Sequence, residues 1–150
     1  MKNILLISTM YLMALTLNAQ RYVDLGLPSG TLWKDVNEAE LIAFDAAFLT
    51  YGNSLPTKAQ FDELVENCNW TWNRNGYKVT GANGNSIFLP ADGFRDCNGD
   101  LKNGQNHGNY WSSSTGELGR AWSCNFTSVM FGVSSAERCS WRAVRLVKSK

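Results

Sequence analysis

The sequence predicts an α+β fold, because helix-forming segments occupy the front of the chain and short strands follow them. Residues 35–52 and 57–68 place apolar side chains at helical spacing. From residue 76 onward, the chain divides into short segments rich in aromatic and β-branched residues, separated by Gly, Asn, Asp and Ser. We find no internal repeat, linker or low-complexity tract, so a single domain is expected.

The first predicted helix lies within residues 35–52. This segment is rich in Ala and Leu, and its apolar side chains recur at roughly helical spacing: Leu41, Phe44, Ala47 and Phe48. Gly52 is expected to end the helix.

The second predicted helix begins after Thr57 and has the clearest local signal in the chain. Thr57 and Gln60 form the T-x-x-Q pattern of a capping box, in which each side chain accepts a hydrogen bond from a free backbone N–H at the helix start. The residues that follow give one apolar face at positions i, i+3, i+4 and i+7: Phe61, Leu64, Val65 and Cys68.

Short strands are predicted in the remaining two thirds of the domain. The segments are GYKVTG (76–81), SIFLPA (86–91), YWSSS (110–114), AWSCNF (121–126), VMFGVS (129–134) and WRAVRLV (141–147). NGNS at residues 83–86 predicts a hairpin turn between the first two. Helical spacing and strand context together predict a buried core of Phe61, Leu64, Val65, Ile87, Leu89, Trp111, Phe126, Val144 and Leu146.

The N-terminus has the pattern of a signal peptide. A basic start at Lys2 precedes an apolar run over residues 4–17, and Ala19 is a small residue where a signal peptidase would cut. A membrane anchor is the alternative, but the run is interrupted by hydroxyl side chains and is shorter than the ~20 apolar residues of a span. We therefore expect a signal peptide at 1–19, a single exported domain at 20–150 and no membrane span. The final location would be periplasmic, cell-surface or extracellular.

The charge balance gives no indication of a nucleic-acid partner. Removing residues 1–19 takes away Lys2 and leaves 13 basic against 13 acidic side chains. A chain without net charge lacks the positive surface that binds nucleic acid or an anionic membrane.

Four cysteines in an exported chain permit disulfides: Cys68, Cys97, Cys124 and Cys139. Four cysteines allow three pairings. We favour Cys97–Cys139, because both lie in polar, turn-rich segments, and we expect the other two to be free and buried. Zinc is disfavoured, because there is no C-x-x-C pair and the single histidine has no partner at ligand spacing.

The two remaining chemical motifs both favour structural interpretations. Ser112–Ser114 lie downstream of His107, but the G-x-S-x-G elbow of a nucleophile is absent, and the serines suit a strand end or bonds to backbone. Asp96, Asn98 and Asp100 have the 1, 3, 5 spacing of a calcium loop, yet Leu101 replaces its glycine and His107 its glutamate. An ordinary polar turn is favoured there, and we predict no metal or cofactor.

Several blocks in order resemble one domain family. YVDLGLPSGTLW, LPTKAQFDEL, NCNWTW, GYKVTGANGNSIFLPADGFR, YWSSS and AVRLV, spanning about Tyr22 to Val147, are similar to the Fibrobacter succinogenes major paralogous domain family, which is abundant in Bacteroidetes. The chain departs from that family in a compact segment at residues 34–54, where many members have a longer insert.

The resemblance implies a C-type lectin-like fold, a group that also includes formylglycine-generating enzymes and the variable proteins of diversity-generating retroelements. It implies two helices packed on a small twisted antiparallel sheet, with the first and last strands close together. It also implies that YWSSS is a structural block of the sheet.

Three classes of function are open. The first is a secreted, non-catalytic recognition domain for a glycan or protein, binding through loops on a rigid scaffold. The second is an enzyme related to formylglycine-generating proteins, but no matching cysteine pair is found. The third is a structural or toxin-like surface protein without a small ligand. The Glu-Pro-Asn and Trp-Asn-Asp motifs of calcium-dependent lectins are absent.

The recognition hypothesis places the binding surface on three loops, at residues 103–110, 114–120 and 134–141. These loops mix polar residues with an aromatic anchor, as recognition surfaces often do. The resembling retroelement proteins also diversify this C-terminal region. The predicted contacts are Asn106, His107, Glu117, Arg120, Glu137 and Trp141.

Overall fold

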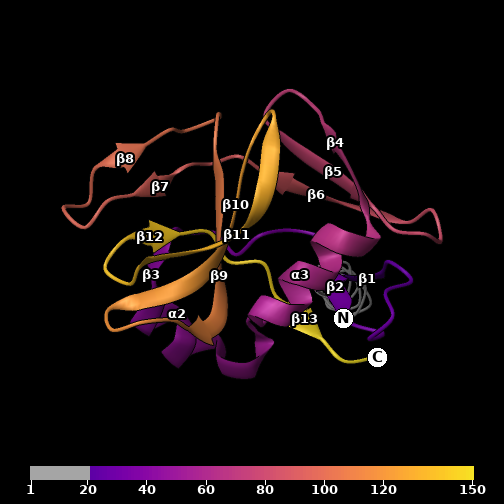
Figure 1. The fold of residues 1–150 in the computed structure, drawn as a ribbon, viewed down its shortest axis with the longest axis horizontal. Coiled ribbons are helices and arrows are strands. Elements are labelled where there is room, and N and C mark those ends of the chain that lie inside the picture. The colour runs from indigo at the N-terminus through magenta and orange to yellow at the C-terminus, as the bar shows by residue number, and fades with distance from the viewer. Residues whose placement is uncertain (1–20) are drawn as a thin grey trace, which may run out of the picture.

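The computed structural model describes residues 21–150, so the predicted signal peptide lies outside the described residues. In this part of the chain, two α-helices and four small antiparallel sheets form the α+β fold expected from the sequence. Figure 1 shows three long strands crossing the middle of the molecule, a smaller sheet on each side of them, and the helices below.

The three long strands are β9 (Gly108–Thr115), β10 (Arg120–Thr127) and β11 (Met130–Glu137). They pair in the order β11-β10-β9, with β10 antiparallel to both neighbours. An irregularity between Ala121 and Ser123 shifts the register with β9. All three were predicted as strands, because their short apolar runs are separated by clear turn residues.

A second sheet contains β4 (Asn69–Trp72), β5 (Gly76–Thr80) and β6 (Ser86–Pro90). The turn joining β5 and β6 is the predicted NGNS hairpin, with Thr80 paired to Ser86. Strand β4 was not predicted. The aromatic rings of Trp70 and Tyr77 on β4 and β5 pack edge to face, which ties this sheet into the core.

The third sheet, on the other side, has the order β3-β12-β7-β8. Its strands have only two residues each: β3 (Ile42–Ala43), β7 (Phe94–Arg95), β8 (Leu101–Lys102) and β12 (Trp141–Arg142). The strand predicted over 141–147 is therefore divided. Ala143 forms a single parallel bridge with Tyr110, and pairing resumes only at β13 (Val147–Lys148).

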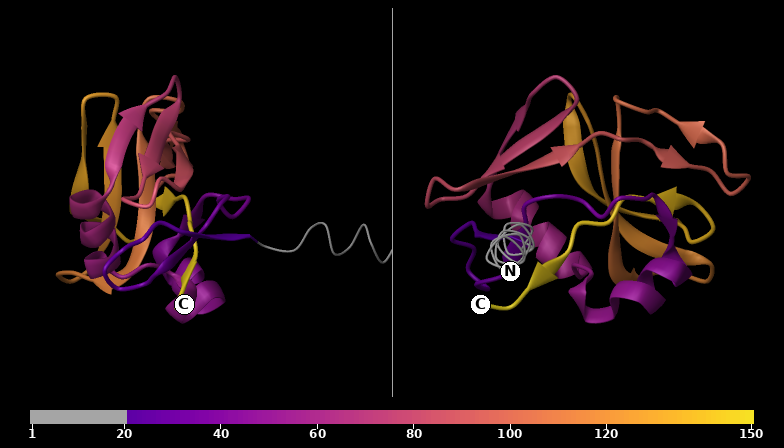
Figure 2. Two further views of the ribbon diagram at one scale, coloured as in Figure 1. Left: turned by 90° about the vertical axis from the view of Figure 1, so that its right-hand side faces the viewer. Right: turned by 180° about the vertical axis from the view of Figure 1, so that it is seen from behind.

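The fourth sheet joins the two ends of the described chain. Its strands are β1 (Tyr22–Asp24), β2 (Leu32–Lys34) and β13, in the order β1-β2-β13. Val23 and Val147 both pair with Trp33 at the centre of β2. The first and last strands are thus close together, as the resemblance implies, and both views in Figure 2 place them below the β4-β5-β6 sheet.

The first helix, α2 (Phe44–Tyr51), is shorter than the sequence predicted. Residues 35–43 are not helical, because their backbone groups bond to distant parts of the chain. The N–H of Asp35 donates to the carbonyl of Arg21, the N–H of Glu38 donates to the carbonyl of Val144, and Ile42–Ala43 pair with β12. Gly52 ends the helix as expected, and a short 3₁₀ turn, η1 (Gly52–Ser54), follows.

The second helix, α3 (Lys58–Asn67), begins where the capping box predicts. Thr57 Oγ1 accepts from the N–H of Gln60 at 3.1 Å, and Gln60 Oε1 accepts from the N–H of Thr57 at 2.8 Å. Neither α2 nor α3 has the length and apolar character that a helix needs to cross a bilayer.

The core has two apolar clusters. One contains Phe61 and Leu64 of α3 against β5 and β6, and the other contains Phe44 and Ala47 of α2 against Trp111 of β9. Eight of the nine predicted core residues are buried: Phe61, Leu64, Ile87, Leu89, Trp111, Phe126, Val144 and Leu146. Val65 is only partly buried and packs on the edge of the first cluster.

Candidate functional site

A polar cleft of about 420 Å³ lies where the central sheet faces the small β3-β12-β7-β8 sheet. We call it the Arg142 cleft. Five strands and their turns contribute to its wall: Phe94, Asp96, Cys97, Asn109, Arg120, Asn125, Ser134, Ser135, Ala136, Glu137, Ser140 and Arg142. Its size is within the range of small-molecule sites in proteins.

Arg142 is the most buried charged group of this wall, with 8% of its surface exposed. Its guanidinium lies near the rings of Phe94 and Trp111, at 5.1 and 5.2 Å from their centroids. Both contacts are within the distance at which an aromatic ring attracts a cation. The two rings therefore help to fix the orientation of the guanidinium.

Three neutral oxygens accept hydrogen bonds from Arg142. Nε donates to Ser140 Oγ at 3.1 Å, and Nη1 donates to Asn125 Oδ1 at 2.8 Å and to Ser123 Oγ at 3.3 Å. None of the ion pairs within residues 21–150 includes Arg142. Its charge is therefore buried without a carboxylate partner among these residues.

Burial is the main reason why the pKa of Arg142 falls to about 10, and the nearby positive charge of Arg120 lowers it further. The guanidinium remains charged at neutral pH. A charge removed from water without a counter-ion is unfavourable. The same environment favours the binding of an anion from outside.

Arg120 brings a second guanidinium to the cleft wall. Its Nε donates to Ser135 Oγ at 2.9 Å, and its Nη2 donates to the carbonyl of Ser135 at 2.7 Å. These bonds connect β10 to β11 and hold the side chain along the sheet. Two arginines thus face one cleft, and neither has an ion-pair partner in the described part of the chain.

Two asparagine amides extend the polar wall. Asn109 Nδ2 donates to Asn125 Oδ1 at 2.9 Å, and Asn125 Nδ2 donates to Ser134 Oγ at 2.8 Å. Asn109 Oδ1 is buried and has no hydrogen-bond partner among the described residues. These groups give the cleft both donors and acceptors.

The rim of the cleft is acidic and contains the disulfide. Cys97, in the turn after β7, is bonded to Cys139, after β11, with their Cα atoms 5.0 Å apart. The predicted pairing is thereby confirmed, and Cys68 and Cys124 are free. Cys124 is buried as expected, whereas Cys68 is only half-buried.

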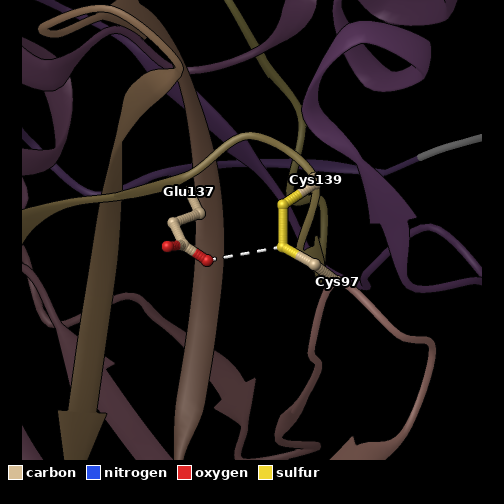
Figure 3. Close-up of side chains that lie close together, drawn as sticks. All are labelled: Cys97, Glu137 and Cys139. Atoms are coloured by element: carbon tan, nitrogen blue, oxygen red, sulfur yellow. Dashed lines mark hydrogen bonds between the residues drawn. A yellow bond between two sulfur atoms is a disulfide. The ribbon is translucent and has the colours of Figure 1, made fainter.

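Glu137 approaches the disulfide, with Oε2 at 3.4 Å from Cys97 Sγ (Figure 3). A disulfide sulfur has no proton to donate, so this is a close contact and not a conventional hydrogen bond. Cys97, Glu137 and Cys139 cluster closely enough to surround a metal ion. However, the two sulfurs are bonded to each other, so the cluster lacks the thiolates of a zinc site.

The other acidic rim residue, Asp96, is part of a polar turn. Its Oδ1 accepts from the N–H groups of Asn98 at 3.0 Å and of Asp100 at 3.1 Å. Together with Lys102, these bonds lower the pKa of Asp96. One carboxylate oxygen is therefore used by the backbone of the turn itself, as the polar-turn interpretation predicted.

The serines of YWSSS have structural partners. Ser112 is buried, and its Oγ donates to the carbonyl of Trp122 at 2.8 Å. Ser114 Oγ accepts from the N–H of Lys58 at 2.9 Å, at the start of α3. Both bonds connect β9 to neighbouring elements and support the structural interpretation of this segment.

The structure brings two of the six predicted contacts, Arg120 and Glu137, to the Arg142 cleft. Glu117 lies in the turn before β10 and Trp141 lies on β12, where 43% of its surface is exposed. Asn106 and His107 lie in the loop between β8 and β9. These four do not line the cleft and stay predictions for a wider surface.

Sequence reasoning did not select Arg142, Asn109 or Asn125 as site residues. Arg142 has one available signal, which Arg145 shares: both charged residues interrupt the otherwise largely apolar closing segment at 141–147. Asn109 lies in a segment predicted as a loop and Asn125 in one predicted as a strand. That the two side chains meet follows from the register of β9 and β10, which has no local sequence signal.

Comparison with known proteins adds no relative: no family model, no curated protein and no solved structure matches the chain.

Proposed function

We propose that this chain is an exported, non-catalytic recognition domain with a C-type lectin-like fold, which binds a glycan or protein ligand in the Arg142 cleft. The observation that supports this most directly is a polar cleft on the C-terminal strands, with two arginines that lack ion-pair partners in the described residues. Binding sites of this kind combine a rigid wall with a few converging polar groups.

Two further features support export and a rigid scaffold. A disulfide forms and persists in oxidising compartments, which agrees with the signal-peptide pattern of residues 1–19. The bond also joins two turns at the rim of the cleft. A rim held in this way loses less conformational entropy when a ligand binds.

The free thiols do not favour the alternative of a cysteine-dependent enzyme. Burial raises the pKa of Cys124 to about 12 and that of Cys68 to about 11. The reactive form of cysteine is the thiolate, and catalytic cysteines have lowered pKa values. Both thiols are therefore protonated at neutral pH.

The test uses the full chain, exported into the periplasm, on a glycan array and in a pull-down from bacterial and host lysates. Ser134→Trp places a large ring in the cleft from an exposed position of β11. Thr71→Trp is the matched control, because Thr71 is exposed on β4 and does not line the cleft.

We expect the wild type and Thr71→Trp to bind the same ligand, and Ser134→Trp to lose that binding while keeping its thermal stability. Equal binding by Ser134→Trp would move the site away from the cleft. The absence of any ligand for the wild type would favour the structural or toxin-like alternative.

A further inference from the structure

We infer that the Arg142 cleft binds a sugar acid, with the carboxylate of a hexuronic acid residue on Arg142 and the sugar hydroxyl groups on the polar rim. This inference rests on the proposed function and names the ligand class of the same site.

The first step concerns the free donor of Arg142. Nε and Nη1 have protein acceptors, but no acceptor for Nη2 is found among the described residues. Among the described residues, the buried side-chain N and O atoms that have no hydrogen-bond partner are Trp33 Nε1 and Asn109 Oδ1. Nη2 has no acceptor and is not one of these buried atoms, so it retains solvent-accessible surface. Arg142 is itself a lining residue of the cleft, and the cleft is therefore where we place this free donor.

The second step concerns the rigidity of this group. Hydrogen bonds to Ser140, Asn125 and Ser123, and rings of Phe94 and Trp111, hold the guanidinium in one orientation. A carboxylate that binds there forms a charge-assisted hydrogen bond with little reorganisation of the protein. It also compensates a buried charge that has no ion-pair partner in residues 21–150.

The third step uses the distribution of charge. Two arginines and two carboxylates, Asp96 and Glu137, line the same cleft. Asp96 is already engaged by its own turn and by Lys102, whereas Glu137 has only the close contact with the disulfide sulfur among the described residues. A simple anion would meet repulsion from this rim and offer Glu137 no hydrogen-bond donor. A sugar acid has one carboxylate for Arg142 and several hydroxyl groups that can donate to Asp96 and Glu137.

The neutral wall fits the same ligand. Ser134, Ser135 and Asn125 offer hydroxyl and amide groups along β10 and β11, and Phe94 adds an aromatic ring. A peptide has backbone N–H donors, but its acidic side chain carries the carboxylate on a flexible stem without donors of its own, whereas a hexuronic acid carries hydroxyl donors on the same ring as its carboxylate. We therefore favour a sugar acid over a peptide.

The experiment is a ¹H–¹⁵N NMR titration of the full chain after export. The sugar probes are the methyl glycosides of glucuronic and galacturonic acid, each compared with its uncharged methyl ester. N-acetyl-Gly-Glu-Gly-amide is the peptide probe. Arg142→Gln and Arg120→Gln remove the positive charges of the cleft. Arg138→Gln is the matched control, because Arg138 pairs with Asp45 and does not line the cleft.

We expect at least one sugar acid to bind about tenfold or more tightly than its ester, because the esters cannot form the charge-assisted bond. Its titration should shift the resonances of Asn125 and Ser134. Arg142→Gln should remove the preference for the acid, Arg120→Gln should reduce it, and Arg138→Gln should retain it. Circular dichroism checks that each variant is folded. If Arg142→Gln does not fold, Arg120→Gln decides the outcome. A reduced preference for the acid over its ester would then support the inference, and an unchanged preference would overturn it.

Equal affinity for acid and ester would overturn the inference and leave recognition by the cleft intact. Tighter binding of the peptide, dependent on Arg142, would also overturn it, because the partner would then be an acidic protein. Two results together would overturn the proposed function itself. In the titration, the resonance shifts would be confined to residues outside the cleft; on the array, Ser134→Trp would bind as the wild type does.

Discussion

Two arginines of the closing segment, Arg142 and Arg145, are both buried but differ in how completely their donors are used. Arg145 donates from Nε to Asn37 Oδ1, from Nη1 to the carbonyl of Lys34 and from Nη2 to the carbonyl of Phe88. All three of its nitrogens therefore have acceptors, and the side chain joins three segments of the core. Arg142 leaves Nη2 without an acceptor among the described residues, which is the basis of its proposed role.

At the scale of a single residue, the substitution Leu64→Ala tests the packing of the first apolar cluster. Leu64 has no exposed surface, so Leu64→Ala should lower the free energy of unfolding by about 2–5 kcal/mol through lost transfer energy and a cavity. Urea denaturation measures the change. Val65→Ala is the control and should cost less, because Val65 is only partly buried. A loss below about 0.5 kcal/mol for Leu64→Ala, typical of surface sites, would contradict this assignment.

Cys124 gives a pH-dependent prediction. Its pKa is about 12 in the folded protein, against 9.0 for an ordinary thiol. Above pH 9 the unfolded thiol loses its proton while the folded one keeps it, so stability decreases as the pH rises from about 9 towards 12. From Cys124 alone, we expect the free energy of unfolding to fall by about 2 kcal/mol between pH 8 and pH 10.5.

Urea denaturation at several pH values measures this loss, with Cys124→Ala as the control that lacks the thiol. The difference in slope between the two proteins isolates Cys124 from other groups that titrate at high pH. Parallel curves for the wild type and Cys124→Ala would show that the thiol is not buried as described.

At the scale of secondary structure, helix α3 depends on its capping box. Thr57→Ala removes the acceptor for the N–H of Gln60 and should lower stability by about 1 kcal/mol. Thr50→Ala is a suitable control, because Thr50 is exposed on α2 and bonds only to the carbonyl of Ala46 one turn earlier. Thermal unfolding should separate the two variants, and equal melting temperatures would argue against the cap.

The contrast between α2 and α3 shows which elements local sequence can predict. The start of α3 is set by neighbours three residues apart, Thr57 and Gln60, so it is visible in the sequence. The start of α2 is set by contacts with Val144 and β12, about 100 residues away. Helical spacing over 35–43 could not reveal those partners.

The same reasoning applies to the candidate site. Arg120 and Glu137 were predicted from the composition of segments expected to be loops. The structure places them on strands instead, at the start of β10 and the end of β11, and both line the cleft. Arg142 and Asn109 meet there only because Ala143 forms a bridge to Tyr110 and its N–H donates to the carbonyl of Asn109. This junction between two distant segments has no local sequence pattern.

For the whole molecule, the disulfide links residues 42 positions apart. Closing a loop of this length in the unfolded chain corresponds to about 4 kcal/mol of stabilisation in the chain-entropy model. Reduction should therefore lower the melting temperature of the wild type. A Cys97→Ser, Cys139→Ser double variant should begin at the lower value and show no response to reductant.

The paired result separates the disulfide from other effects of the reductant. If the double variant also lost stability on reduction, the sensitivity would lie elsewhere. If the oxidised and reduced wild type melted together, the bond would not stabilise the domain.

The placement of β1 and β13 on either side of β2 determines how the domain would respond to mechanical force. Both strands run antiparallel to β2 and therefore parallel to each other, so the chain enters this sheet at one end and leaves it at the other. Tension between Tyr22 and Lys148 would load the hydrogen bonds of the sheet in shear, and several bonds would have to break together. Because the Arg142 cleft is built from other strands, a ligand could stay bound while this sheet resists the pull.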